Sequence, residues 1–394
     1  MTQDTMRIGF IPLVDAAALI VAVDKGFAAE EGVAIELARE VSWSNVRDKL
    51  NIGVFDAAHL LAPLAIASSL GIGHVKVPLL APYMLGLNGN AITLSPGLYD
   101  ALLAAADGDL RNPKVSALAL GRVVAERRGK GAEPLTFGMT FPFSTHNYQL
   151  RFWLAVGGVD PDEDVRLVVL PPPYMVDSLA SHHVDGFCVG APWNSVAVKL
   201  GIGRIVHFGC DIIARAPEKV LAVRAAWAAD RTADRADVLQ RLLRALGRAA
   251  DFINDPARED EVVLLLAAPN RVDVAPEIIR GALNGRMPMA LDGSSRSSTD
   301  YILIGRDGAA RPEPAHAAWL YAQMVRWKQT ALSPALLAAA KACFRPDLYD
   351  AALGPAASAK APHKLLDSVG GFAGPPFDPD DIAGYVEASR MHNR

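Results

Sequence analysis

The first 95 residues alternate short apolar runs with helical segments, and the connections between them are short. The apolar runs predict strands at 7–12, 33–37 and 56–60. Capping residues or a first-turn proline mark the helix starts between and after them, at Asp15, at Ser42 or Ser44, and at Pro63. A β-α-β-α-β run with short connections predicts a parallel, doubly wound sheet, so the chain should begin with an α/β lobe.

A second alternation of strands and helices begins at Leu135 and continues to residue 208. Because 394 residues are too many for one core of ordinary size, we expect two lobes. The predicted division assigns 1–95 plus 210–394 to lobe 1, with carboxy-terminal helices and an irregular strap over 361–382. Lobe 2 is predicted to comprise 96–209, with a helical linker at its start. The predicted fold is therefore α/β and two-lobed, of the type II periplasmic-binding-protein kind, with a ligand cleft between the lobes.

The cleft that this fold predicts favours a small anion. In open α/β sheets, ligands bind beyond the carboxyl ends of the strands, where helix amino termini point. The partial positive charge of those termini attracts negative groups. The chain as a whole carries a formal charge of −4, so an anion must be held by a local set of donors, and no nucleic acid or lipid surface is predicted as a direct partner.

Cysteine usage and apolar runs exclude other classes of protein. The three cysteines, at 188, 210 and 343, lack metal-ligand spacing, which predicts neither a disulfide framework nor a metal site. The residues that begin the chain lack the pattern of a secretory leader, and the apolar runs are shorter than the roughly 20 residues of a membrane span. We therefore expect a cytoplasmic protein without a membrane segment.

Four side chains at predicted strand-helix junctions or lobe crossings are candidates for holding an anion. They are the indole of Trp43, the amide of Asn90, the imidazole of His146 and the ammonium of Lys219. Gly89 would permit close backbone approach, and the prolines around Pro172 would shape a wall. Each residue also has an ordinary structural interpretation, as a packed aromatic ring, a turn, or a solvated polar side chain. We find no nucleophile-base arrangement and no phosphate loop, so an enzyme is not predicted, and neither is a cofactor.

Several long motifs in fixed order resemble the nitrate/bicarbonate-binding family related to the substrate-binding proteins of ABC transporters. The resemblance spans essentially the whole chain. The motifs are WSNVRD (43–48), NGNAIT (88–93), FPFSTHNYQLRFWLAVGGVDPDEDV (141–165), PPPYMV (171–176), DGFCVGAPWN (185–194) and APEKVL (216–221).

The resemblance implies that Trp43, Asn90, His146 and Lys219 contact the anion, with backbone near Gly89 and Pro172 lining the site. Transport members of the family are expected to carry an acidic residue where Ala191 stands. Loss of that acceptor favours nitrate or nitrite, which only accept hydrogen bonds, over bicarbonate.

Within the family, the motifs are most similar to cytoplasmic nitrate sensors of the NasS type. That resemblance implies a partner, the NasT-like ANTAR antiterminator, which binds RNA and would be released when the anion closes the lobes. Two alternatives stay open at this point: the substrate-binding component of a nitrate/bicarbonate ABC transporter, and an enzyme similar to pyrimidine-precursor synthases.

Overall fold

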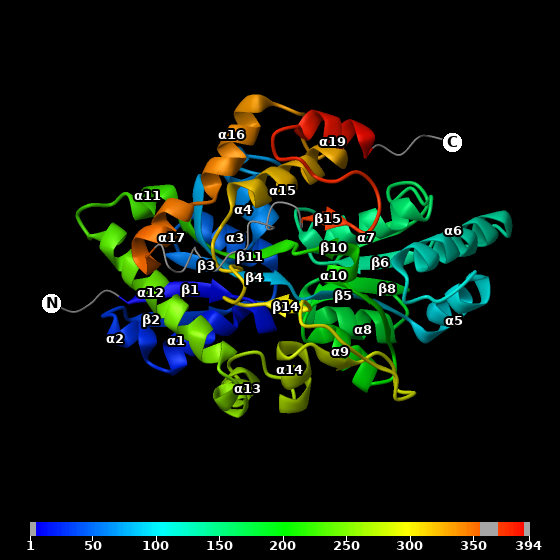
Figure 1. The fold of residues 1–394 in the computed structure, drawn as a ribbon, viewed down its shortest axis with the longest axis horizontal. Helices are drawn as coiled ribbons and strands as arrows, with labels where there is room; N and C mark the ends of the chain where they lie inside the picture. Colours follow the sequence, from blue (N-terminus) through cyan, green and yellow to red (C-terminus); the bar gives the residue numbers. More distant parts are fainter. Residues whose placement is uncertain (1–4, 355–368, 390–394) are drawn as a thin grey trace.

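The computed structural model describes residues 5–354 and 369–389, and it divides into two lobes with one main sheet each (Figure 1). The sheet of lobe 1 has six strands and that of lobe 2 has five. Both sheets carry helices on their faces, which confirms the predicted two-lobed α/β fold.

Lobe 1 begins with the predicted parallel unit. Strands β1, β2 and β3 pair in parallel, in the order β3-β1-β2. Their bounds and those of the intervening helices are β1 Met6–Phe10, η1 Val14–Ala16, α1 Ala17–Asp24, α2 Phe27–Glu30, β2 Ile35–Arg39, α3 Trp43–Asn51, β3 Ala57–Leu61 and α4 Ala62–Leu70.

The sheet of lobe 1 is mixed, whereas the sequence pattern predicted a parallel sheet. Strand β11 (Pro217–Arg224) inserts between β3 and β4 (Leu79–Asn88) and runs antiparallel to both. Strand β14 (Ile302–Leu303) pairs with the other side of β4 and forms the edge of the sheet. Because β11 follows lobe 2 in the chain, local periodicity could not reveal that it occupies a central place in the first sheet.

Lobe 2 has the strand order β7-β6-β8-β5-β9. Its elements are β5 Asn90–Leu94, α5 Pro96–Ala105, α6 Pro113–Gly129, β6 Thr136–Met139, α7 Thr145–Val156, β7 Arg166–Val169, η2 Pro172–Tyr174, α8 Met175–Ala180, β8 Gly186–Gly190, α9 Trp193–Lys199, β9 Arg204–Phe208 and α10 Gly209–Ile212. The predicted alternation from Leu135 onward therefore matches the observed order of strands and helices.

The structure places the first crossing between the lobes at Gly89, earlier than the predicted division at residue 95. Strand β5, at 90–94, pairs with β8 and β9 and so belongs to the second sheet. Gly89 has φ +90°, and an added Cβ would lie 3.1 Å from side-chain atoms of Ile302. A residue without a side chain therefore suits the point where the chain turns from one sheet into the other.

The carboxy-terminal helices α12, α15 and α16 return to lobe 1. Helix α12 packs along α1, while α15 and α16 pack on α4 (Figure 1). Of the predicted strap, 361–368 lies outside the described residues, and 372–381 contains neither helix nor strand. The remaining elements are β10 Ile213–Ala214, α11 Ala225–Ala228, α12 Arg235–Asn254, η3 Pro256–Arg258, α13 Glu259–Ala267, α14 Pro276–Leu283, β12 Arg286–Pro288, β13 Ser295–Ser297, α15 Pro314–Arg326, α16 Pro334–Cys343, α17 Pro346–Leu353, β15 Gly370–Gly371 and α19 Ile382–Ala388.

Within the described ranges, no helix is both long enough and apolar enough to cross a bilayer.

Candidate functional site

Four predicted site residues meet in the interior between the lobes. Trp43 and Lys219 come from α3 and β11 of lobe 1, while Asn90 and His146 come from β5 and α7 of lobe 2. Their exposed fractions are 1% for Trp43 and 0% for the other three. The structure thus brings together side chains that are far apart in the sequence and removes all four from solvent.

Trp43 is placed by the start of α3. The Ser42 hydroxyl accepts a hydrogen bond from the Asn45 amide at 3.3 Å, which caps the helix and sets Trp43 in its first turn. The indole ring lies edge-on to His59, with ring centroids 5.3 Å apart, and Lys219 Nζ lies 5.3 Å from the indole centroid. The indole N–H has no hydrogen-bond partner among the described residues.

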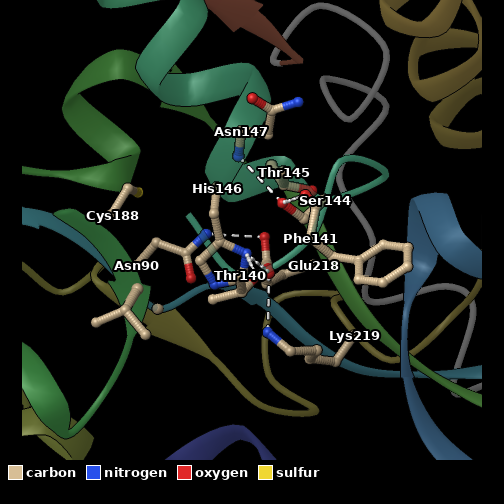
Figure 2. A network of polar contacts seen from close by, with 12 residues as sticks. Asn90, Thr140, Phe141, Ser144, Thr145, His146, Asn147, Cys188, Glu218 and Lys219 are labelled. Atoms are coloured by element: carbon tan, nitrogen blue, oxygen red, sulfur yellow. Dashed lines mark hydrogen bonds and ion pairs between the residues drawn. The ribbon is translucent and has the colours of Figure 1, made fainter. Parts of the chain in front are cut away.

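His146 is placed in the same way by the start of α7. The Ser144 hydroxyl accepts a hydrogen bond from the Asn147 amide at 3.1 Å (Figure 2). His146 Nδ1 lies 3.1 Å from the Thr140 hydroxyl oxygen, and Nε2 has no hydrogen-bond partner among the described residues.

Lys219 lies between two carboxylates. Its Nζ is 2.9 Å from Asp15 Oδ2 and 2.8 Å from Glu218 Oε1. Consecutive strand residues normally point to opposite faces of a sheet. Here the pairing of β11 with β4 shifts register on both sides of Lys219, since Pro217 lies opposite Leu87 and Lys219 opposite Gly86. This bulge lets Glu218 and Lys219 contact each other.

The carboxylate of Glu218 occupies the point where three of the predicted donors, Asn90, His146 and Lys219, converge (Figure 2). Besides Lys219, it is approached by His146 Nδ1 at 3.2 Å from Oε1, and its Oε2 accepts a hydrogen bond from Asn90 Nδ2 at 2.9 Å. Asn90 Nδ2 also donates to Gln149 Oε1 at 3.0 Å, while Asn90 Oδ1 has no partner among the described residues. The carboxylate of Glu218 therefore contacts the same donors that were predicted to bind an external anion.

Asp15 and His59 complete the arrangement. His59 Nε2 lies 2.9 Å from Asp15 Oδ1, and the Ile11 amide donates to His59 Nδ1 at 3.4 Å. Gly86 faces Asp15 so closely that an added Cβ would be 3.3 Å from the Asp15 Cβ. We call the following seven residues the buried cluster: Asp15, Trp43, His59, Asn90, His146, Glu218 and Lys219.

Burial and charge pairing determine the protonation states of the carboxylates and the amine. Burial raises the pKa of Asp15, but Lys219 and His59 outweigh it, so that the pKa lies below the usual value. Burial lowers the pKa of Lys219, but the two carboxylates outweigh it and raise the pKa overall. For Glu218, burial raises the pKa more than Lys219 lowers it.

The two imidazoles of the buried cluster are neutral at neutral pH. Burial is the main cause in both cases. For His146, the positive charge of Lys219 adds to the effect of burial, and the pKa falls well below the usual value. For His59 the neighbouring Asp15 offsets part of the effect, and the pKa is still lowered.

The lobes are in direct contact around the buried cluster. The Val14 amide donates to the Ala191 carbonyl at 2.9 Å, and the Thr145 hydroxyl donates to the Pro217 carbonyl at 2.8 Å. Both bonds join lobe 1 to lobe 2. Since the members of the buried cluster are at most 1% exposed, a ligand can reach them only after the lobes separate.

Gly89 and Pro172 were predicted to line the site, and the polar contacts that define the buried cluster do not include them. The Gly89 carbonyl accepts from the Ala191 amide at 2.9 Å and from the Tyr301 hydroxyl at 3.1 Å. Pro172 begins the turn η2 and is buried. Ala191 is likewise buried, beside the crossing at Gly89.

Sequence reasoning missed the acidic half of the buried cluster. Asp15 was interpreted as a helix cap, yet it lies within η1 and its carboxylate points to Lys219 and His59. Glu218 was quoted only as part of the motif APEKVL. The one available signal was the pair of adjacent opposite charges at 218 and 219, in a strand that is otherwise apolar up to Val223. Among the described residues, no group of three or more His, Cys, Asp or Glu is arranged to hold a metal ion.

Two lobes that close over a buried polar cluster define the class of two-lobed solute-binding proteins, and solved structures bear this out. The crystal structure of the periplasmic nitrate-binding protein NrtA from Synechocystis PCC 6803 superimposes with a TM-score of 0.85, at 26% identity, over 99% of both chains. The model of the NMT1-like family matches residues 1–267. The chain belongs to this family.

Curated relatives agree with the structural likeness. The nitrate/nitrite binding protein NrtA of Synechococcus elongatus is 30% identical over 98% of this chain and 86% of its own length. The nitrate import ATP-binding protein NrtC of Synechocystis is 32% identical over 98% of this chain, which spans 55% of that relative's length.

Proposed function

We propose that the protein binds a small oxyanion, nitrate or nitrite, between its lobes at the buried cluster. The observation that carries this proposal is the convergence of Asn90, His146 and Lys219 from both lobes on one carboxylate, that of Glu218, with the Trp43 ring next to Lys219 Nζ. A site that holds one carboxylate with an ammonium, an amide and an imidazole has the donors that a planar oxyanion requires. The indole N–H of Trp43, which has no hydrogen-bond partner among the described residues, supplies a further donor.

Anion identity follows from what the buried cluster can accept and donate. The absence of an acid at Ala191 favours nitrate or nitrite. Glu218 and Asn90 Oδ1, which has no partner in the described part of the chain, are however acceptors that would suit the hydroxyl of bicarbonate. Bicarbonate is therefore the competitor against which the preference has to be measured.

The role that relatives support best is that of a substrate-binding component of an ABC transporter. Relatives named for nitrate binding and nitrate import match nearly the whole of this chain. The sensor role, with a NasT-like antiterminator as partner and a cytoplasmic location, rests on the sequence resemblance alone and stays a prediction. A binding role, and not catalysis through a lysine Schiff base, is supported by Lys219, because two carboxylates hold its amine in the charged form.

Calorimetry with nitrate, nitrite and bicarbonate on the same sample tests the proposal. We expect heat of binding for nitrate or nitrite and a weaker response to bicarbonate. The Asn90→Leu variant removes the amide of lobe 2 that donates to Glu218 of lobe 1. This variant should bind the anion measurably more weakly. Saturable binding of none of the three anions would contradict the proposal.

The sensor role has its own experiment. A NasT-like antiterminator and this protein are mixed and run on size-exclusion chromatography with increasing nitrate. A complex that dissociates with nitrate supports the sensor role, while failure to form a complex, or a complex indifferent to millimolar nitrate, favours the transporter role.

A further inference from the structure

The position of Glu218 makes anion binding dependent on a proton. We propose that the protein takes up about one proton per acceptor-only oxyanion, and that the Glu218–His146 pair holds this proton in the bound state. This inference rests on the proposed function and specifies how the same site is regulated.

A count of charges in the buried cluster gives the first argument. Asp15 and Glu218 are two acids around a single ammonium, Lys219, and the imidazoles of His59 and His146 are neutral. With Glu218 ionised, the buried cluster is thus already one negative charge in excess before any ligand binds. A second uncompensated negative charge in a dry interior costs several kcal/mol. Uptake of a proton keeps the net charge constant when nitrate enters.

The geometry of His146 gives the second argument. Its Nδ1 lies 3.2 Å from Glu218 Oε1, and its Nε2 has no partner among the described residues. If Glu218 is ionised, the neutral imidazole places its hydrogen on Nδ1, facing the carboxylate, and Nε2 presents a lone pair that repels an anion.

A proton added to the pair reverses the role of His146 Nε2. If the proton lies on Glu218 Oε1, this oxygen can donate to His146 Nδ1, and the imidazole hydrogen moves to Nε2. If the proton lies on His146 instead, both ring nitrogens carry hydrogens. In either case Nε2 becomes a donor that can bind the anion. One proton therefore removes a repulsion and creates a hydrogen bond at the same time.

The surroundings of Glu218 favour this protonation. Burial raises the pKa of Glu218 above the usual value for a glutamate. The Cys188 thiol is neutral, because burial and Glu218 raise its pKa well above the usual value. The titratable or charged groups that face Glu218 are Lys219 of β11, His146 of α7, Asp15 of η1, His59 of β3 and Cys188 of β8, with the amide of Asn90 from β5.

The proton count can be measured directly. Nitrate is titrated into the wild-type protein by calorimetry in Tris, imidazole and bicine, which are amine buffers of different ionisation enthalpy. The slope of observed enthalpy against buffer ionisation enthalpy gives the protons taken up. At pH values above the titration of the pair, we expect uptake of about one proton and a Kd that rises about tenfold per pH unit.

Two variants assign the proton to the pair. In Glu218→Gln the carboxylate charge that the proton would neutralise is absent, so nitrate should bind with no proton uptake and with a Kd independent of pH. His146→Gln should bind nitrate more weakly and also lose the uptake. Glu277→Gln, which removes an exposed carboxylate paired with Lys199, is the matched control and should behave like wild type. Thermal melting verifies that each variant is folded.

Each outcome decides between the two proposals. Nitrate binding by wild type with no proton uptake from pH 6 to pH 9 overturns this inference and leaves the proposed function intact. Uptake that persists in folded Glu218→Gln assigns the proton to another group and also overturns it. If neither wild type nor Glu218→Gln binds nitrate or nitrite at any pH, the proposed function itself fails. The wild-type proton count decides on the coupling even if a variant does not fold.

Discussion

The ammonium nitrogen of Lys219 lies 2.9 Å from Asp15 Oδ2, although one residue belongs to a strand that follows lobe 2 and the other to the first connection of lobe 1. Both side chains are buried, with exposed fractions of 0% and 1%. The cation is therefore oriented before any ligand arrives. The arrangement also makes lobe 1 dependent on Lys219 for its stability.

Replacing Lys219 with Met should destabilise the fold. The substitution keeps the volume of the side chain but leaves the carboxylates of Asp15 and Glu218 buried without a cation, which costs about 3–5 kcal/mol. Urea unfolding followed by circular dichroism measures the loss. Lys199→Met, which breaks an exposed ion pair with Glu277, is the control and should leave the midpoint unchanged. Equal midpoints for the two variants would contradict the role assigned to Lys219.

The variant Trp43→Phe should weaken nitrate binding while the fold stays intact. The ring remains, and the indole N–H that is lost has no hydrogen-bond partner among the described residues. A hydrogen bond to a charged ligand contributes about 1.5–3 kcal/mol, so Kd should rise roughly 10-fold to 100-fold. Calorimetry measures the affinity and thermal melting the stability.

Trp319→Phe provides the control for Trp43→Phe. Trp319 is also buried, and its indole N–H likewise has no partner in the described part of the chain, but it lies in α15, outside the buried cluster. Its substitution should leave nitrate affinity unchanged. An unchanged affinity in Trp43→Phe as well would remove the indole N–H from the site.

Gly86→Ala should disturb the pair of Asp15 and Lys219. The added Cβ would lie 3.3 Å from the Asp15 Cβ, which requires the aspartate to shift away from its present position. Crowding of this kind costs about 1–3 kcal/mol. Gly97→Ala, in the first turn of α5, is the control, because its added Cβ meets no atom within 4 Å. If Gly86→Ala unfolds at the same temperature as Gly97→Ala, an alanine at position 86 does not crowd Asp15.

The free energy of unfolding should fall as the pH drops below about 6.5. Burial lowers the pKa of His207 to about 3 and that of His316 to about 4, and the pKa of His146 lies well below its usual value. The unfolded chain therefore binds protons at these histidines while the folded protein does not. Each histidine lowers the free energy of unfolding by about 1.4 kcal/mol per pH unit until the pH reaches its folded-state pKa. Glu218 acts in the opposite direction, because its pKa is raised.

His316→Gln measures one of these contributions. Urea unfolding at pH 6.5, 5.5 and 4.5 gives the slope of stability against pH for the variant and for wild type. The slope should be smaller in the variant by about 1.4 kcal/mol per unit, while measurements at pH 8 correct for any change in packing. Identical slopes would show that His316 does not remain neutral in the folded protein.

Local sequence signals predicted the parts of the site that are built by helix starts. Ser42, one of the two serines expected to begin this helix, caps α3, and Ser144 caps α7; these caps fix where Trp43 and His146 emerge. Such signals are reliable because the serine hydroxyl acts on an amide only a few residues away.

The remaining features depend on contacts between distant segments. The insertion of β11 between β3 and β4 places Lys219 beside Asp15, and no periodicity within β11 specifies that place. The bulge that brings Glu218 into contact with Lys219 arises from pairing with β4. A sequence alone indicates that two opposite charges are adjacent in a strand, but not that both turn inward.

The late arrival of β11 also bears on how the protein is made. As the ribosome delivers the chain, β3 and β4 emerge well before residues 217–224, so the first sheet stays split until lobe 2 has been synthesised. A fragment that stops short of β11 would expose the unpaired flanks of two apolar strands, which promotes aggregation. Nascent chains of increasing length should thus resist protease in lobe 1 only once β11 has left the exit tunnel, and the same event would bring Glu218 and Lys219 into the buried cluster.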